Sequence, residues 1–356
     1  MARISKFERW FFKAQFGGKE RIRIYRKIIR LLQNGVPLLQ ALESIWLLAS
    51  RDGKKPGLPV ARILQVWIEN VKNGKPLDVA IQGWVPETDR TVIGAGDASG
   101  KLPEAIENAC FLYEGQKKIK TAVIAGVAYP IVLFAMVVAF LFIFGLDVIP
   151  KFETALPRDR WTGLAGQMAS MADFVQAWMI PLLAVVGCVV VAMFWSMPRW
   201  TGKLRVRFEK WPPYSIYKLV SGSGFLLSMA ALTAAGVKQT VALRSMMRDA
   251  RPWYEERIAK TLYHVNNGLN LGEALHRTGL RFPDDETVND LRTYATLNGF
   301  DEMLMRLGRE NLEETIERIK QQSTVMRNAG IILAGVVIAW LFMGIFSIQQ
   351  QITMAL

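Results

Sequence analysis

Three stretches of this 356-residue chain carry no charged side chain over a length that could cross a lipid bilayer. They are 123–146, the residues between Asp173 and Arg199, and 329–348. A membrane-crossing helix needs about 20 predominantly apolar residues, and a soluble helix of that length without a charge is rare. We therefore predict three transmembrane helices. The charged fraction of 21% is too high for a chain that lies mostly in lipid, so we also expect sizeable water-exposed domains.

The basic residues predict how these helices are oriented. They gather at one end of each apolar stretch: Lys117, Lys118, Lys120, Arg199, Lys203, Arg205, Arg207, Arg318, Lys320 and Arg327. Because basic segments stay on the cytoplasmic side of a membrane, the two long segments outside the stretches, 1–120 and 199–327, should be cytoplasmic. The N-terminus is then expected in the cytoplasm and the C-terminus on the far side.

These two observations predict the order of domains along the chain. It is a cytoplasmic helical domain over 1–120, a transmembrane helix over 121–146, a short outer loop over 147–173, a second transmembrane helix over 174–198, a second cytoplasmic domain over 199–327, a third transmembrane helix over 328–348 and an outer tail over 349–356.

The two cytoplasmic domains repeat one another. Gly35 and the apolar helical stripe before it return at Gly236, and the block from Gly74 to Leu77 returns from Gly268 to Leu271. Pro86 and Gly100 are matched in the same order by Pro283 and Gly299. No period-2 alternation typical of strands is present over a useful length. The predicted fold class is all-α, with two homologous helical bundles.

Catalytic and metal-binding motifs are missing from the sequence. The nearest approach to a phosphate-binding loop is Gly100-Lys101, where Ala95 replaces the first required glycine and Leu102 the required hydroxyl. His264 and His276 stand in no metal-ligand spacing, and the two cysteines offer no disulfide framework. We expect no catalytic residue, no cofactor and no metal.

Two other function classes remain as alternatives. The net charge of +13 is compatible with nucleic-acid binding, but the positive excess lies largely beside the membrane, so no direct nucleic-acid contact is expected. A small membrane transporter subunit is the stronger rival. Transporters usually place ionisable groups at membrane depth, however, and the three apolar stretches hold none.

A set of short motifs, in a fixed order, resembles a known family. They are Gly74-Lys-Pro-Leu77, Val85-Pro86, Gly96-Asp97-Ala-Ser99-Gly100-Lys-Leu102 and Tyr129-Pro130 at the first apolar stretch. Together with the duplication they resemble the inner-membrane platform proteins of type II secretion and type IV pilus machines, the GspF/PilC family. The resemblance covers nearly the whole chain.

The resemblance implies a non-enzymatic coupling protein of the bacterial inner membrane. Such a platform protein couples a hexameric cytoplasmic assembly ATPase to insertion of the major pilin or of pseudopilins into a growing filament. Other inner-membrane assembly proteins are implied as partners, and a homo-oligomer is expected. A pilus, a secretion system and a DNA-uptake platform all remain open as the machine served.

The sequence departs from the family pattern around its acidic motif. Many members carry Glu where this chain has Asp97, and the second copy, Ala295 to Gly299, has lost the acid. The front end is also short. These departures suggest a type IVb-like or plasmid pilus branch.

Candidate residues follow from the motifs. Asp97 either caps a helix or contacts a partner, and Pro130 either shapes a groove or fits the packing. The remaining candidates, for turns, caps or partner contacts, are Gly35, Gly74, Leu77, Gly96, Ser99, Gly100, Gly236, Gly268, Leu271 and Gly299. We also expect rigid connections at 117–121, 199–207 and 320–327 to carry motion between the domains and the membrane.

Overall fold

The computed structural model describes residues 12, 15–248, 250–295 and 299–355, and over these residues it contains helices, turns and loops but no strand. The predicted all-α class is confirmed. The first residues of the domain predicted over 1–120, and Thr296 to Asn298 of the second acidic motif, lie outside the described residues.

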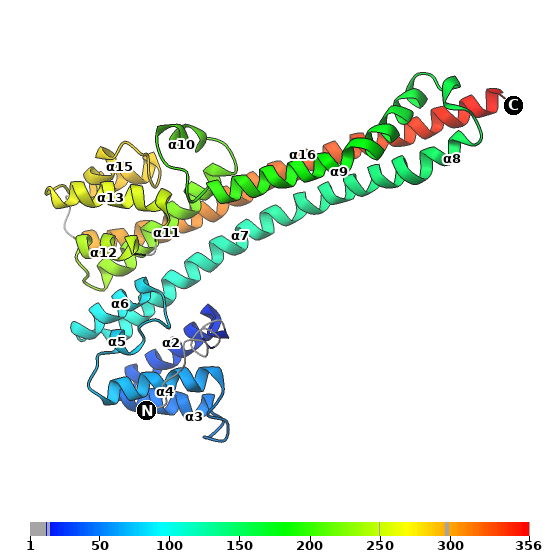
Figure 1. Ribbon diagram of the computed structural model, residues 1–356. Coiled ribbons are helices and arrows are strands. Elements are labelled where there is room, and N and C mark those ends of the chain that lie inside the picture. The colour runs from blue at the N-terminus through cyan, green and yellow to red at the C-terminus, as the bar shows by residue number, and fades with distance from the viewer. Residues whose placement is uncertain (1–11, 13–14, 249, 296–298, 356) are drawn as a thin grey trace. The chain divides into compact units, whose positions relative to one another are not determined.

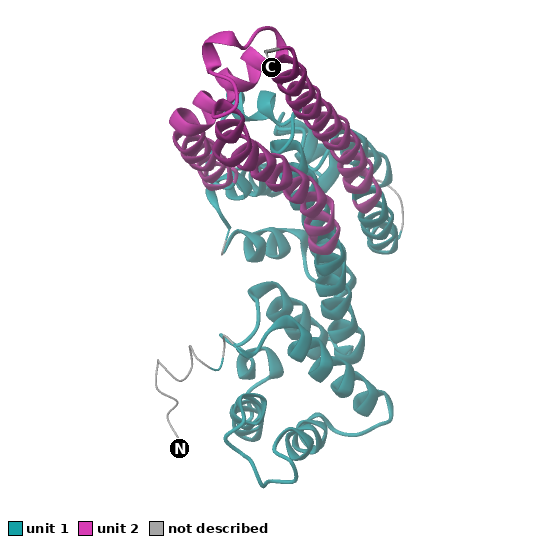
Figure 2. Cartoon of the chain, turned by 90° about the vertical axis from the view of Figure 1, so that its right-hand side faces the viewer, with its two compact units in different colours: residues 1–119, 198–315 teal, residues 120–197, 316–356 magenta. Residues whose placement is uncertain are grey.

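The chain forms two compact units (Figure 2). The first combines 1–119 with 198–315, so both sequence repeats lie in one unit. The second combines 120–197 with 316–356 and holds the three apolar stretches.

Over the described residues, each repeat supplies six helices in the same order (Figure 1). The first copy comprises α2 (Gly18–Gln33), α3 (Leu38–Ala49), α4 (Pro59–Lys72), α5 (Leu77–Ala80), α6 (Glu87–Ala98) and the start of α7 (Leu102–Ile143). The second comprises α11 (Tyr214–Ala234), α12 (Gln239–Met247), α13 (Pro252–Asn266), α14 (Leu271–Arg277), α15 (Asp285–Tyr294) and the start of α16 (Phe300–Ala355). The short helix α10 (Lys203–Phe208) precedes the second copy.

The repeated glycines end equivalent helices in the same way. Gly35 after α2 and Gly236 after α11 have φ angles of 78° and 81°, which an L side chain rarely adopts. In each turn the next residue donates its N–H to the carbonyl five positions back, Val36 to Leu31 and Val237 to Leu232, both at 3.0 Å. This bonding satisfies helix-end carbonyls that would otherwise be orphaned.

Large apolar side chains fill the core of each repeat. In the first copy Trp67 of α4 and Tyr25 of α2 are almost fully buried. In the second copy Trp253 of α13 packs edge-on against Phe282 with ring centroids 5.8 Å apart, and Phe282 also contacts Phe225 of α11. Each bundle therefore buries an aromatic centre of its own.

Four described helical stretches, rather than three, are long and apolar enough to cross a membrane. Three of them contain the predicted spans. The fourth is α11, but 61% of its apolar window is buried inside the protein, compared with 6–22% for the others. Its residues 225–232 form the core of the second repeat, so burial against protein accounts for its apolar sequence.

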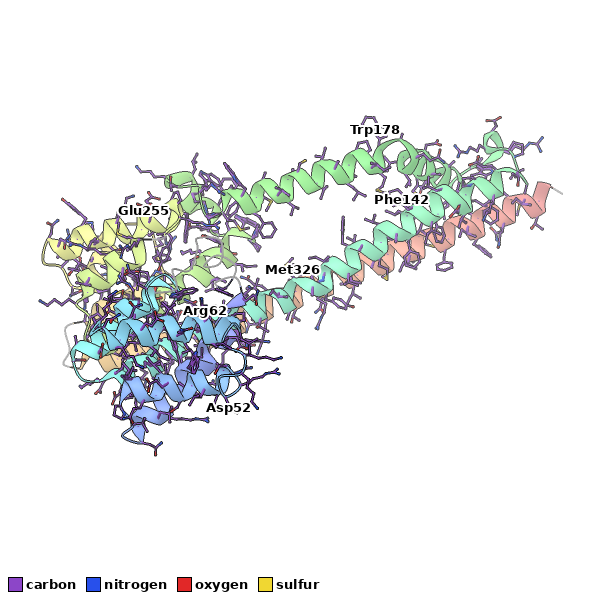
Figure 3. The ribbon with its side chains drawn as sticks, turned by 60° about the horizontal axis from the view of Figure 1, so that its bottom comes forward. Asp52, Arg62, Phe142, Trp178, Glu255 and Met326 are labelled. Atoms are coloured by element: carbon purple, nitrogen blue, oxygen red, sulfur yellow. The ribbon has the colours of Figure 1, made fainter. Side chains whose placement is uncertain are left out.

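The second unit consists of long helices that expose apolar side chains. They are the later part of α7 with the π-helical turn η1 (Phe144–Val148) and α8 (Ile149–Glu153), then α9 (Leu164–Ser196), and the later part of α16. Trp178 on α9, labelled in Figure 3, is 63% exposed. Exposed apolar surface along such helices is what a lipid environment accepts.

The part of this unit that contains the predicted loop and tail is more structured than those predictions imply. A buried cluster there joins Ile149 and Trp161 to Leu341 and Ile348. The helix α16 continues through the predicted tail, where the Gln351 amide exchanges hydrogen bonds of 3.0 and 3.1 Å with the backbone of Thr162.

The three connections between the units are not alike. The helix α7 is unbroken through 117–121, and α16 is unbroken through 320–327. Between α9 and α10 the chain leaves the helix over 197–202. Two of the three connections are thus continuous helices, whereas the one at 199–207 is not.

Candidate functional site

The Asp97 carboxylate caps the helix that follows Gly74. Its Oδ2 accepts a hydrogen bond from the backbone N–H of Leu77 at 3.1 Å. Leu77 is the first residue of α5, and the N-cap residue before it, Pro76, has no side-chain group that could accept this bond. A residue from the end of α6 therefore supplies the cap that the local sequence lacks.

The glycines around Asp97 allow α6 and α7 to approach each other closely. A side chain at Gly96 would place its Cβ 2.1 Å from the Cβ of Ala105 and 2.9 Å from the carbonyl oxygen of Lys101. Gly100 has a φ of 71°, and the Ser99 hydroxyl donates to the Gly96 carbonyl at 3.3 Å. Gly96, Ser99 and Gly100 thus form the tight turn between α6 and α7.

The second copy caps the equivalent helix differently. Leu271, the first residue of α14, is fully buried, like Leu77 in the first copy. Here Asn270 is the N-cap residue, and its own Oδ1 accepts from the N–H of Glu273 at 2.8 Å. Gly268 and Gly299 occupy turns with φ angles of 87° and 78°.

Pro130 lies in α7 within the second unit, away in sequence from the other candidates. Near it α7 and α16 approach closely at a small residue, because a Cβ at Gly126 would lie 2.0 Å from the Ser323 hydroxyl. Such close approaches at glycine are typical of packed membrane helices.

A groove of about 590 Å³ lies between the two repeats. Its walls come from α5 and α6 of the first copy and from α12, with the turn before it, of the second: Asp78, Glu87, Arg90, Thr91, Gly94, Ala95, Val237, Lys238, Val241, Arg244, Ser245 and Arg248. The groove adjoins Gly236 but contains none of the candidate residues that the sequence motifs suggested.

Glu87 joins the two walls of the groove. Its carboxylate pairs with Arg90 on the same helix and with Arg248 of the second copy at 2.6 Å. Hydrogen bonds from Arg90, and then from Arg248, lower the pKa of Glu87, so the carboxylate stays ionised at neutral pH. Arg248 is largely exposed, and such a pair contributes at most about 1 kcal/mol.

The other basic residues of the groove are open to a partner. Lys238 and Arg244 are exposed, and neither forms an ion pair with another described residue. The exposed side chain of Val241 stands between them in sequence. This wall combines two positive charges with an apolar contact.

Sequence comparison identifies the family. The model for type II secretion system (T2SS) protein F matches residues 24–150 and again residues 225–348. The chain belongs to this family. The double match confirms the internal repeat, and the family with its apolar helices places the protein in the inner membrane.

Relatives of the protein F family serve pili and secretion systems. The chain is 22% identical to Toxin coregulated pilus biosynthesis protein E of Vibrio cholerae, over 95% of this chain and 98% of that protein. It is 24% identical to Type 4 fimbrial assembly protein PilC of Pseudomonas putida, over 92% and 83%. It is also 24% identical to Type II secretion system protein F of Xanthomonas campestris, over 76% and 67%. The predicted platform family is confirmed.

The structure also contains two buried clusters of charged residues that the sequence did not predict. In the first copy Asp89 is buried, contacts Arg21 at 2.9 Å and accepts a hydrogen bond from Tyr25 at 3.3 Å. Burial raises the pKa of Asp89 to about 6. Neither partner lies near Asp89 in sequence, so no local spacing could have shown the cluster.

The second cluster surrounds Glu209. Its Oε1 accepts hydrogen bonds from Arg257 at 2.5 Å and from the Trp253 indole at 2.9 Å, and Arg205 lies 3.3 Å away. Lys218 approaches the other oxygen at 4.0 Å. Burial lowers the pKa of Arg257 to about 10. One indication of this cluster was present in the sequence, because Glu209 is the only acidic residue among the basic residues of 203–210.

Among the described residues, no group of three or more His, Cys, Asp or Glu side chains could hold a metal ion.

Proposed function

We propose that this protein is the inner-membrane platform of a pilus or secretion machine and that it transmits movement from a cytoplasmic ATPase to filament subunits in the membrane. The observation that carries the proposal is the pair of unbroken helices, α7 and α16, that run from the unit holding the repeats into the apolar unit. A continuous helix transmits displacement, whereas a loop absorbs it.

The orientation follows from the charges. The repeats, with their basic residues, lie in the cytoplasm, and the cluster around Ile149 and Trp161 lies on the periplasmic side. The N-terminus is then cytoplasmic and the C-terminus periplasmic. The domain boundaries predicted from the sequence are part of this proposal. The protein acts without catalysis of its own.

The groove between the repeats is the proposed contact for the ATPase. An acidic segment of the ATPase, carrying an apolar side chain, would pair with Lys238 and Arg244 and cover Val241. Breaking the Glu87–Arg248 pair costs at most about 1 kcal/mol. Binding of the ATPase in the groove can therefore change the contact between the repeats at a small cost in free energy.

A pilus machine is the favoured setting. The chain covers 98% of the Vibrio cholerae pilus biosynthesis protein, but only 67% of the Xanthomonas campestris secretion protein. The major pilin and other inner-membrane assembly proteins are the remaining proposed partners.

Helix-breaking insertions test the transmission of movement. A Gly-Gly-Ser-Gly insertion after Lys118 interrupts α7, and the same insertion after Pro198 lengthens an existing loop. With both variants present in the membrane at the parent level, the first should abolish filament assembly and the second should retain it. Normal assembly with α7 interrupted would refute the proposal.

Charge reversal tests the ATPase contact. The double variant Lys238→Glu/Arg244→Glu should no longer co-purify the ATPase after crosslinking in native membranes. The matched control is Lys54→Glu/Lys55→Glu, which reverses two exposed charges in the loop after α3. Equal recovery of the ATPase with both variants would exclude the groove as its contact.

A further inference from the structure

The segment 199–211, just after the second predicted span, presents an unusual surface. Three large apolar side chains spaced i, i+4 and i+7 point to solvent: Leu204 is 67% exposed, Phe208 49% and Trp211 71%. The positions that face the protein are instead charged, because Arg205 and Glu209 are 0% and 6% exposed. An ordinary surface helix shows the reverse pattern.

The buried charges hold this inverted face in place. Glu209 is bound to Arg257 and Trp253 of α13, and the Arg205 guanidinium lies 4.4 Å from the ring centre of Tyr214. The apolar residues therefore cannot turn inward without separating a buried ion pair, which is costly. Their exposure is a fixed feature of the fold.

Three basic residues alternate with these apolar residues along α10 and the turn that follows it. Lys203, Arg207 and Lys210 share the same i, i+4, i+7 spacing, and all three are exposed. Large apolar side chains next to a basic stripe are typical of a segment that lies in the headgroup layer of a membrane. Aromatic residues at this level are favoured as well, and Trp200 packs against Phe208 with ring centroids 5.4 Å apart.

The chain itself keeps the segment close to the bilayer. The helix α9 ends at Ser196 and α10 begins at Lys203, and the stretch between them spans at most about 25 Å when fully extended. Water-exposed apolar groups at this distance from a membrane have a lipid surface within reach.

We propose that the 199–211 segment is an interfacial anchor that binds anionic phospholipid headgroups. The side chains of Leu204, Phe208 and Trp211 insert among the acyl chains, and those of Lys203, Arg207 and Lys210 meet the lipid phosphates. The anchor fixes the second repeat to the membrane at the one connection that is not a continuous helix. The proposal goes beyond the platform function and does not depend on the ATPase contact.

Depth-dependent fluorescence quenching of the full-length protein tests the anchor. The fluorophore bimane is attached to the cysteine of the Trp211→Cys variant in a Cys188→Ala background. The bimane label replaces the apolar ring system that Trp211 provides. Cys110 stays, because it is buried and burial raises its pKa to about 12, so it remains an unreactive thiol. The matched control is bimane at Tyr263→Cys, an exposed aromatic position on α13.

The two labelled proteins are reconstituted in nanodiscs of phosphatidylcholine alone or with one quarter phosphatidylglycerol, each with a lipid carrying a shallow nitroxide. Quenching should be strong at 211 and absent at 263, and it should increase with the anionic lipid. Aqueous iodide should quench the label at 263 and spare the label at 211.

Removing the charges tests the headgroup contact. Each basic residue near an anionic surface strengthens binding about fivefold, so Lys203→Gln/Arg207→Gln/Lys210→Gln should lower the ratio of bound to unbound segment roughly 100-fold. The control Lys54→Gln/Lys55→Gln/Lys75→Gln should leave quenching at 211 unchanged.

Two results would overturn the proposal. Iodide quenching at 211 as strong as at 263, without quenching by the lipid nitroxide, would place the segment in water and leave it for a protein partner. Equal lipid quenching at 211 in both lipid mixtures would exclude binding to anionic headgroups.

Discussion

Replacing Glu209 by glutamine should sharply destabilise the unit formed by 1–119 and 198–315. The carboxylate is shared by Arg205, Arg257 and Lys218, of which the two arginines are almost fully buried. Glutamine keeps the volume and can still accept the 2.9 Å hydrogen bond from the Trp253 indole. The change therefore removes the negative charge and little else.

The magnitude follows from the cost of uncompensated buried charge. Removing one partner of a buried ion pair costs about 3–5 kcal/mol. In a unit of 150–250 residues each kcal/mol lowers the melting temperature by about 2–4 °C. Glu209→Gln should thus lower the melting temperature by about 6–20 °C, measured by tryptophan fluorescence of the full-length protein in detergent.

The matched control removes a cation from the same cluster. None of the three side-chain nitrogens of Arg205 has a hydrogen-bond partner among the described residues, and burial lowers the pKa of this group. Arg205→Met leaves Glu209 paired with Arg257 and reduces the positive excess, so it should change stability by less than about 1.5 kcal/mol. If Glu209→Gln melted within about 2 °C of the parent, or no lower than Arg205→Met, the charge argument would be refuted.

Three further predictions use the same melting assay. Gly96→Ala should destabilise the first unit by about 1–3 kcal/mol, because the new Cβ would lie 2.1 Å from the Cβ of Ala105. The control Gly224→Ala has open space around it in α11 and should stabilise the unit by up to about 1 kcal/mol. Unchanged stability of Gly96→Ala would contradict the close contact between α6 and α7. Asp97→Ala should lower the stability by about 1 kcal/mol, because α5 loses its cap. Adding Pro76→Asn should restore this stability, since Pro76 (φ −63°, ψ 160°) has nearly the backbone angles of the capping residue Asn270 (φ −65°, ψ 163°). If Pro76→Asn did not restore it, Asp97 would stabilise the unit in some way other than by capping. Because burial raises the pKa of Asp89 to about 6, the folded state binds more protons than the unfolded state between pH 4 and 6, and stability from this group increases as the pH falls. Relative to Asp89→Asn, the parent should gain about 1 kcal/mol, or about 2–4 °C, between pH 7 and pH 5, and a constant difference would show that the raised pKa is wrong.

Helix content and the repeat were predictable because they depend on local patterns. The glycines at 35 and 236 are set by the left-handed turn that each must adopt, and this requirement is visible in the sequence itself. The three lipid-facing stretches were equally visible, because an uncharged helix of that length has few other uses.

Other features were hidden because they depend on tertiary neighbours. The apolar sequence of α11 is compatible with a membrane span, and only its burial among the helices of the second repeat accounts for it otherwise. The groove was missed because Glu87 meets Arg248 across 161 positions of sequence. Motif residues such as Gly96 were found, but the structure assigns them to packing and capping and places the groove elsewhere.

The loss of the acidic residue from the second copy has a physical explanation in the caps. In the first copy proline precedes α5, so the cap must come from another helix, and Asp97 supplies it. In the second copy Asn270 caps α14 with its own side chain, which removes the need for a distant acid. An acid required in both copies would have implied a shared binding role. We therefore interpret Asp97 as a structural partner of Pro76, and we propose the groove and the 199–211 segment as the recognition surfaces of this protein.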